Sequence, residues 1–457
     1  MTTLDREALR ASLAPLRTDA LRSAAIAAPL VAPERLLAAA PASAFLLASA
    51  DGGACGIDEA VVLRAEGAER FANVRSEADA VFDRMVARGD SDAPLPRFFG
   101  GFAWQPGAAS RGAWKAFGDG NFVMARWLYE RTESRAFLRL TLAPGERLDA
   151  ALDELDRIEA SLNTPLSSGG TRYRRLNGEN FDEYAERIEA ITEAIDAGDF
   201  AKIVAARQVG ATLGHALPLQ HAVASLSRRY PACTRFAFRR GNAYFVGATP
   251  EMLIDRHGRR VASEALAGTS SSRRSEELMA SRKDAAEHAL VVDAIASRLT
   301  NYATLEPLPD QPQLHALPGV LHLRTPLIGE LRAPSHVLTL TEALHPTPAV
   351  AGVPAGQARD WIAANEPPRG WYASPIGHFD QAGNGRFYVA LRCGLVEDRR
   401  ATAFAGGGIV SGSKPAAEHA ESELKLEAFL GALGAEERTA LGEGRRTVVA
   451  KNPHPAR

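Results

Sequence analysis

The fold is decided by the stretch FAFRRGNAYFVGATPEMLIDRHG at 236–258. It contains three short runs rich in aromatic and branched residues together with two turn pairs: FAF at 236–238, GN at 241–242, YFVG at 244–247, MLID at 252–255 and HG at 257–258. Strands joined by such tight turns are antiparallel. The stretch therefore predicts a meander of antiparallel strands, and not the alternating strands and helices of a Rossmann sheet.

Elements on either side extend this pattern. RFYVALRCGLV at 386–396 and ATAF at 401–404 predict a further pair of strands. Toward the N-terminus, residues 181–198 predict an amphipathic helix that ends at a glycine and leads into a short strand at 200–206. With another helix at 275–300, the sequence predicts an α+β protein built on a large antiparallel sheet.

Chemical motifs are unevenly distributed along the chain. Residues 1–162 mix strand-like runs with alanine-rich helical runs and hold few motifs. NTPLSSGGT at 163–171 predicts a linker or exposed loop, because proline, serine and glycine interrupt regular structure. The motifs gather between about 180 and 433, and we see no internal repeat.

Composition excludes several classes of protein. The 457 residues are 46% hydrophobic and 24% charged, which is typical of a soluble globular protein. A net charge of -2, with no lysine-rich or arginine-rich block, argues against a nucleic-acid surface. We expect no membrane segment and no signal peptide, because no apolar run approaches about 18 residues and the N-terminus is mixed in charge. Three widely spaced cysteines without a CxxC motif suit a reducing cytoplasm: Cys55, Cys233 and Cys393.

Two clusters of glutamates are candidates for a metal site. Glu287 lies in RKDAAEHA at 282–289, three and four residues before apolar positions of the same predicted helix. Glu418, Glu421 and Lys425 are spaced by three and four, so they share one stripe of a C-terminal helix. Each cluster alone could be an ordinary solvated charge pair, such as Glu421 with Lys425. Taken together they predict a divided magnesium site that would hold an acidic substrate.

A base and an acid are also candidates. Lys202 lies within an apolar strand and faces either solvent or the interior; facing inward, its amine could act as a general base. Glu251 follows ThrPro and Glu264 lies in SEALAGT, and either could be the acid. A base and an acid on opposite sides of a ring could add water at one carbon and expel hydroxide from another.

The run AGGGIVSGSK at 405–414 is not a phosphate loop. A phosphate loop needs GlyLys followed by serine or threonine after a fixed four-residue gap, whereas Lys414 follows Ser413 and precedes Pro415. These glycines instead indicate that the backbone must approach a ligand closely.

Ten motifs in fixed order resemble the chorismate-utilising enzymes, and among them the isochorismate synthases. They are FAKIVAAR around Lys202, GATPE at 247–251, EALAGT at 264–269, AEH at 286–288, HL at 322–323, LHPTPA at 344–349, RGWY at 369–372, LRC at 391–393, AGGGIV at 405–410 and the helix of Glu418, Glu421 and Lys425. The resemblance is strong over about 180–433 and loose before it, where GGF at 100–102 is similar. It implies one domain over 1–457, with antiparallel sheets packed as a sandwich flanked by helices.

The resemblance also implies roles for individual residues. Lys202 would activate the water that attacks C2 of chorismate, and Glu251 would protonate the departing C4 hydroxyl. Magnesium would be held by Glu287 and Glu421, with Glu418 and Asp284 close behind. Substrate contacts are implied for seven residues: Tyr372, Arg392 and Gly406 at the pyruvyl carboxylate, Gly268, Thr269 and Lys425 at the other end, and His322 beside the ring.

Two positions separate the subfamilies. Lys202 points to water as the nucleophile, so we expect no glutaminase subunit that would supply ammonia. Ala349 in HPTPA is similar to the isochorismate synthases, whereas salicylate synthases, which go on to eliminate pyruvate, often place a hydroxyl residue there. Salicylate synthase stays the alternative. An inactive relative serving as a binding subunit should have lost at least one of Lys202, Glu251, Glu287 and Glu421. We expect a monomer, and the pathway stays open among siderophore, salicylate and menaquinone synthesis.

Overall fold

The computed structural model describes residues 3–40, 42–167, 169–176, 179–271, 275–318 and 320–437, without the side chains at 269–271. The helices are α1 Arg6–Leu13, α2 Arg70–Phe82, α3 Leu148–Leu152, α4 Leu155–Asn163, α5 Phe181–Asp196, α6 Leu219–Arg229, α7 Ser275–Ala280, α8 Arg282–Leu299, α9 Val337–Leu344, α10 Ala355–Asn365 and α11 Pro415–Leu433, with 3-10 turns η1 Pro33–Ala39 and η2 Gly112–Ala116.

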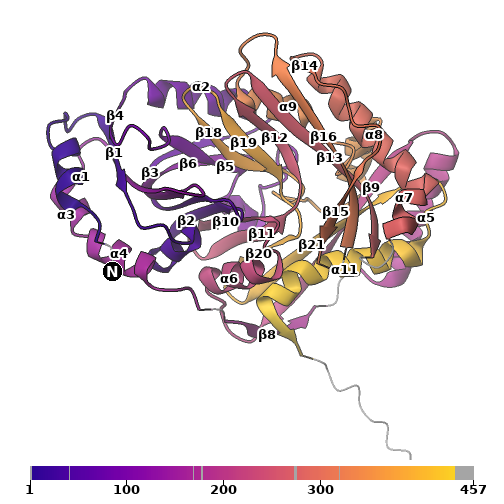
Figure 1. Cartoon of the computed structure of the whole chain (residues 1–457). Coiled ribbons are helices and arrows are strands. Elements are labelled where there is room, and N and C mark those ends of the chain that lie inside the picture. Colours follow the sequence, from indigo (N-terminus) through magenta and orange to yellow (C-terminus); the bar gives the residue numbers. More distant parts are fainter. Residues whose placement is uncertain are drawn as a thin grey trace, which may run out of the picture.

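The strands are β1 Leu21–Ala27, β2 Ser43–Ala48, β3 Gly53–Ala65, β4 Met85–Gly89, β5 Arg97–Phe102, β6 Gly120–Arg131, β7 Ala136–Leu142, β8 Thr171–Arg175, β9 Lys202–Leu213, β10 Thr234–Arg240, β11 Ala243–Thr249, β12 Met252–His257, β13 Arg260–Ser271, β14 Ala303–Leu305, β15 Gln313–Leu317, β16 Val320–Leu331, β17 Gly352–Val353, β18 Pro375–Asp380, β19 Gly385–Val389, β20 Cys393–Glu397, β21 Arg400–Ile409 and β22 Gly434–Glu436. Helices lie around the strands on several sides (Figure 1). The predicted α+β class is confirmed.

The sheet is mainly antiparallel, with parallel pairing where β4 joins β1 and where β22 joins β8. Strands of the N-terminal part pair with strands of the motif-bearing part, since β2 pairs with β10 and β5 with β18. The two parts therefore share one hydrogen-bonded framework, although the early strands lie at one side of the molecule and the helix α8 at the other (Figure 1). The boundary near residue 162 stays a prediction.

The predicted meander is wrong in one respect. β10 and β11 form a hairpin around Gly241–Asn242, and β12 and β13 form a second hairpin around Gly258. However, β11 pairs next with β20, whereas β12 pairs with β19. The chain changes neighbours at Thr249–Glu251, because Pro250 has no N–H to donate to a ladder. The stretch is two hairpins, and Glu251 lies at the junction between them.

Three other predicted elements have different bounds. The segment 386–396 is broken between β19 and β20, where Arg392 adopts a φ of 50° that no extended strand contains. The helix predicted at 275–300 is divided at Ser281, which caps α8 by accepting a hydrogen bond from the backbone N–H of Asp284. The strand predicted at 200–206 is β9, which starts at Lys202 and runs on to Leu213.

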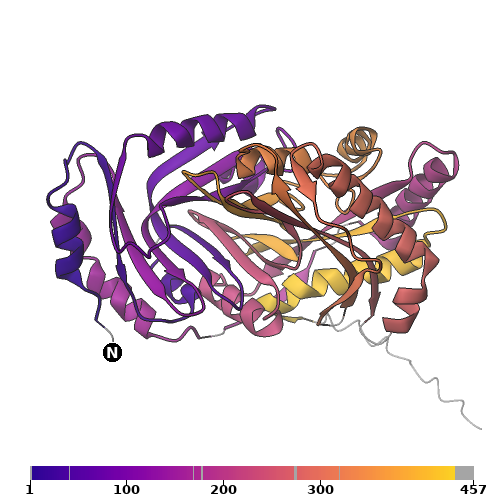
Figure 2. The ribbon, with the colours of Figure 1, turned by 45° about the horizontal axis from the view of Figure 1, so that its top comes forward.

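The core occupies both faces of the central strands. Along β2, Phe45 and Leu47 belong to one hydrophobic cluster, whereas Leu46 belongs to another. The same alternation occurs on β10, where Phe238 and Ala237 lie in different clusters. α11 and α6 cover one side of the sheet, as the turned view in Figure 2 shows. Strands buried on both faces give a rigid frame for the side chains at their ends.

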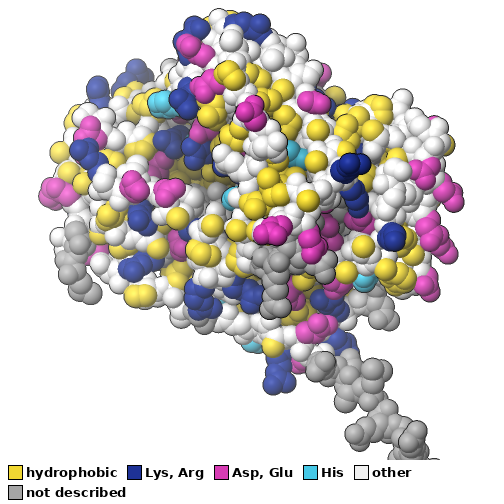
Figure 3. Space-filling view, turned by 45° about the vertical axis from the view of Figure 1, so that its right-hand side comes forward, with side chains coloured by type: hydrophobic (Ala, Val, Ile, Leu, Met, Phe, Trp, Pro, Cys, Tyr) yellow, Lys and Arg dark blue, Asp and Glu magenta, His cyan; other side chains and the backbone are white. Residues whose placement is uncertain are grey.

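Acidic, basic and apolar side chains are interspersed on the side of the molecule that Figure 3 shows. No helix in the described ranges is long and apolar enough to cross a bilayer.

Candidate active site

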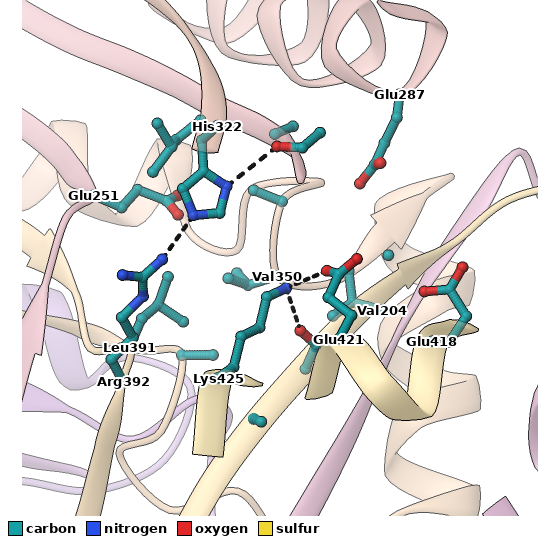
Figure 4. A pocket seen from close by; sticks show the side chains of 18 of the residues that line it. Val204, Glu251, Glu287, His322, Val350, Leu391, Arg392, Glu418, Glu421 and Lys425 are labelled. Atoms are coloured by element: carbon teal, nitrogen blue, oxygen red, sulfur yellow. Dashed lines mark hydrogen bonds and ion pairs between the residues drawn. The ribbon is translucent and has the colours of Figure 1, made fainter. Parts of the chain in front are cut away.

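A cavity of about 290 Å³ lies where β9, β13, β16, β21, α8 and α11 meet. Twelve of the predicted site residues line it: Lys202, Glu251, Gly268, Asp284, Glu287, His322, Tyr372, Arg392, Gly406, Glu418, Glu421 and Lys425. The side chain of Thr269 is outside the described residues. Figure 4 shows the acidic side chains of α8 and α11 on one side, with Glu251, His322 and Arg392 on the other. Residues from distant parts of the sequence thus share one enclosed space.

Lys202 faces the interior. Its side chain is 1% exposed, and its Nζ lies 2.8 Å from Oε1 of Glu287. Burial alone would raise the pKa of Glu287, but the Lys202 ammonium, with smaller contributions from Lys425 and Lys283, outweighs it and lowers this pKa. Gly408 on β21 leaves room for the pair, because a Cβ there would lie 2.4 Å from Oε1 of Glu287 and 2.7 Å from Cε of Lys202. Gly408 therefore lies against these two side chains, and the predicted approach of the glycine run to a ligand stays a prediction.

The two candidate acids have different surroundings. Glu251 lines the cavity and is 3% exposed, and burial together with the charge of Glu264 raises the pKa of Glu251 to about 8. Glu264 lies outside the cavity lining; it accepts a hydrogen bond from the backbone N–H of Met252 at 3.0 Å and forms a salt bridge with Arg324. A neutral carboxylic acid inside the cavity can donate a proton, whereas a paired carboxylate cannot. This geometry favours Glu251 as the acid.

The stripe on α11 has the predicted arrangement. Glu421 and Lys425 form the expected ion pair at 2.7 Å, and Lys425 also donates to the carbonyl of Gly406 at 2.9 Å. Glu418 is buried, and Nζ of Lys283 from α8 lies 3.2 Å from its Oε1. Burial and the charge of Glu421 raise the pKa of Glu418. Asp284 and Glu287 on α8 form the acidic wall of the cavity together with Glu418 and Glu421 on α11, so the glutamate of the predicted charge pair belongs to this wall.

The carboxylates suit a magnesium ion chemically but are already paired with lysines. Glu287 is held by Lys202 and Glu421 by Lys425. In the part of the chain that the structure describes, no three His, Cys, Asp or Glu side chains converge in a metal-binding group. Oxygen donors from Glu287, Glu418 and Glu421 fit a hard cation. The cation would have to displace the lysine ammonium groups that now pair with these carboxylates.

The opposite wall is built around Arg392. Its Nη2 lies 2.7 Å from Nε2 of His322, whose Nδ1 lies 3.2 Å from the carbonyl oxygen of Gly268. Tyr372 stacks on Phe404 with the ring centroids 5.2 Å apart, and burial raises the pKa of Tyr372, so its hydroxyl keeps its proton. A cation and a hydroxyl donor that line the same cavity can bind a carboxylate.

Comparison with known proteins places the chain in a family. A family model described as chorismate binding enzyme matches residues 19–434. The chain belongs to the chorismate-binding enzymes. This member is 35% identical over 397 residues to the salicylate biosynthesis isochorismate synthase of Pseudomonas aeruginosa, and the match covers 82% of each chain. It is 34% identical over 356 residues to isochorismate synthase MenF of Bacillus subtilis, covering 75% of this chain and 76% of that protein.

Solved structures agree with this assignment. MenF, the menaquinone-specific isochorismate synthase from Escherichia coli, superposes on 90% of this chain and 94% of its own, with a TM-score of 0.74 and 27% identity. Anthranilate synthase component I from Streptococcus pneumoniae covers 83% of this chain and 92% of its own, with a TM-score of 0.68. At 17% identity, that second likeness concerns the fold alone.

Sequence reasoning missed two cationic residues of this chorismate-binding enzyme. Lys283 pairs with Glu418. Because Lys283 precedes Glu287 by four residues, it lies on the same face of α8, and this spacing could have placed it in the site. Arg369 lies in the RGWY motif, where no role was assigned to it. Its Nη1 donates to the carbonyl of Val350 at 2.7 Å and its Nη2 donates to that of Val204 at 2.9 Å. Arg369 therefore connects the backbones of two segments that line the cavity.

Proposed function

We propose that this enzyme is an isochorismate synthase that converts chorismate to isochorismate with magnesium. The observation that carries the proposal is that a buried lysine and a protonated glutamate, Lys202 and Glu251, line one cavity beside an acidic wall. The names of the relatives support the same activity, since two that match most of this chain are isochorismate synthases.

The acid step belongs to Glu251. With a pKa of about 8, this side chain holds its proton at neutral pH. It can therefore donate that proton to the C4 oxygen of chorismate as the C4–O bond breaks, so that the group leaves as water.

The base step belongs to Lys202. Its amine, once neutral, takes a proton from a water molecule while the water oxygen forms a bond to C2, and the ring double bonds shift as C4 loses its oxygen. Lys202 ends protonated and Glu251 ends ionised. The two roles are exchanged in the reverse direction, so the reaction is reversible by the same residues. Because the nucleophile is water, the proposed enzyme needs no glutaminase subunit.

The acidic wall would hold magnesium through Glu287 and Glu421, with Glu418 and Asp284 beside them. When bound, magnesium would supply positive charge next to the ring carboxylate of the substrate, which these glutamates would otherwise repel. Arg392 and Tyr372 bind the second carboxylate from the opposite wall. The substrate is thus fixed at both ends, with its ring between Lys202 and Glu251.

Ala349 supports a reaction that stops at isochorismate, because it lines the cavity without a hydroxyl group. The test is an overnight incubation with chorismate and magnesium, followed by chromatography. We expect an equilibrium mixture of chorismate and isochorismate. Stoichiometric salicylate and pyruvate would assign the chain to salicylate synthase instead, and an aminated product formed with ammonia would contradict the role of Lys202.

A further inference from the structure

Arg392 is a buried cation that lies in the cavity wall without a carboxylate partner. Its side chain is 7% exposed, and burial lowers its pKa. None of the ion pairs among the described residues includes Arg392, and the hydrogen bond that its side chain makes with them goes to the imidazole of His322 (Figure 4). A guanidinium that loses hydration without gaining a counterion is costly to bury. Its place in the cavity therefore suits an anionic group of a ligand.

The hydrogen bonds fix the state of His322. A carbonyl oxygen can only accept, so Nδ1 of His322 carries the proton that is donated to Gly268. Nε2 then holds a lone pair and accepts from Arg392. Burial lowers the pKa of His322 well below its usual range, and among the described residues the charges of Arg392, Lys425 on α11 and His315 on β15 lower it further. The ring is therefore neutral and suited to accept from a cation.

Two irregularities of the backbone support this arrangement. In the ladder between β13 and β16, Ala267 faces Leu323 and Thr269 faces His322, so Gly268 is an extra residue in a bulge, with a φ of 74°. The bulge turns its carbonyl toward His322. Arg392 itself has a φ of 50° at the break between β19 and β20. Unfavourable backbone conformations of this kind persist where the surrounding structure requires them, often at functional sites.

We propose that His322 is a positioning residue that holds the guanidinium of Arg392 toward the carboxylate of the substrate. The imidazole connects the bulge at Gly268 to Arg392, so the direction of the guanidinium depends on a rigid strand and not on a long side chain alone. This inference rests on the proposed function, because the anion concerned is the second carboxylate of chorismate.

The test compares His322→Leu with His322→Gln in the full-length enzyme with magnesium. Leucine removes the acceptor, so we expect the KM for chorismate to rise about tenfold or more while kcat changes little, since a hydrogen bond to a charged group is lost. Glutamine offers an oxygen near the position of Nε2 and should restore much of the KM. The matched control is His315→Leu, because His315 faces His322 across the β15–β16 ladder but does not line the cavity.

A double-mutant cycle with Arg392→Ala separates this role from a purely structural one. If His322 acts through Arg392, adding His322→Leu to the Arg392→Ala variant should leave the KM unchanged. Equal and additive losses in the two backgrounds, or a change in kcat alone, would overturn the inference. A wild-type enzyme that does not convert chorismate would contradict the proposed function instead, and this outcome is measured independently of the variants.

Discussion

At the residue scale, Glu251 should control the alkaline side of the pH profile. The acid donates only while protonated, and its pKa is about 8. We expect kcat/KM to fall as pH rises through about 8, and we expect Glu251→Gln to lose activity strongly at every pH. Glu264→Gln should be milder, because Glu264 does not line the cavity. A profile that stays flat to pH 10 would contradict the assignment of Glu251.

The raised pKa of Glu251 also makes the stability of the folded protein depend on pH. Since its folded pKa is raised, Glu251 binds one more proton in the folded than in the unfolded chain between about pH 4.5 and 8. Its contribution to stability is fully present below this window and is lost as pH rises through it. Glu251→Gln cannot ionise, so the variant should gain a few kcal/mol of unfolding free energy relative to wild type between pH 5 and pH 8.5. Denaturant titrations at both pH values measure this difference.

Lys283 provides a second prediction at this scale. A magnesium ion that binds Glu418 must first displace the Lys283 ammonium, and Glu418 raises the pKa of Lys283 despite burial, which opposes the shift. Lys283→Met should therefore bind magnesium several-fold more tightly in calorimetric titrations without substrate. The exposed Lys115 gives the control variant Lys115→Met, which should bind as wild type does. Weaker binding by Lys283→Met would show that the lysine assists the metal site.

The sequence predicted which residues form the site. It did not predict the direction in which each side chain points or which side chains are paired. Lys202 could equally have faced solvent, because an apolar strand has two sides and the sequence does not say which one is covered. The choice between Glu251 and Glu264 also needed the structure, since only the position of Arg324 across the β13–β16 ladder shows that Glu264 is already paired. Such contacts join residues far apart in the chain.

At the scale of elements, the strand β21 shows why its glycines are needed. A methyl group at Gly408 would overlap both Lys202 and Glu287, whereas the nearest atom to one at Gly407 is Oε2 of Glu418 at 3.3 Å. We expect Gly408→Ala to reduce kcat about a hundredfold by moving the base, and Gly407→Ala to be much milder. Thermal unfolding should show that both variants fold. Similar activities for the two variants would contradict this explanation of the glycine run.

Local patterns predicted hairpins and helices but not the points where strands change neighbours. α5 lies where its periodicity and the Asn180–Glu183 capping box place it. Two of the wrong predictions fall at Thr249–Glu251 and at Ala390–Arg392, where one strand ends and the next begins with a different neighbour. In both places the interruption puts an ionisable side chain, Glu251 or Arg392, into the cavity. The chain departs from local preference where the site requires it.

At the scale of the whole molecule, the charges of the cavity nearly cancel. Four cations among the described lining residues, Lys202, Lys283, Lys425 and Arg392, face four carboxylates, Asp284, Glu287, Glu418 and Glu421. Glu251 is protonated near neutral pH, and Arg369 is neutralised by Glu366. A magnesium ion alone or a dianion alone would leave net charge in a buried space, whereas the two together would not.

This balance predicts that magnesium and chorismate stabilise the protein jointly. Because lysines already hold the carboxylates, the enzyme should fold without metal, so excess chelator should abolish activity and leave the melting temperature nearly unchanged. Glu251→Gln, which keeps the charge of the protonated acid and should lose activity strongly, allows the ligands to be added with little reaction. Magnesium and chorismate together should then raise the melting temperature by clearly more than the sum of their separate effects, since a ligand stabilises the folded state according to its affinity. Glu421→Gln should lose most of this joint effect because it weakens the acidic wall. Strictly additive shifts, or full turnover in chelator, would contradict the metal assignment and the charge argument together.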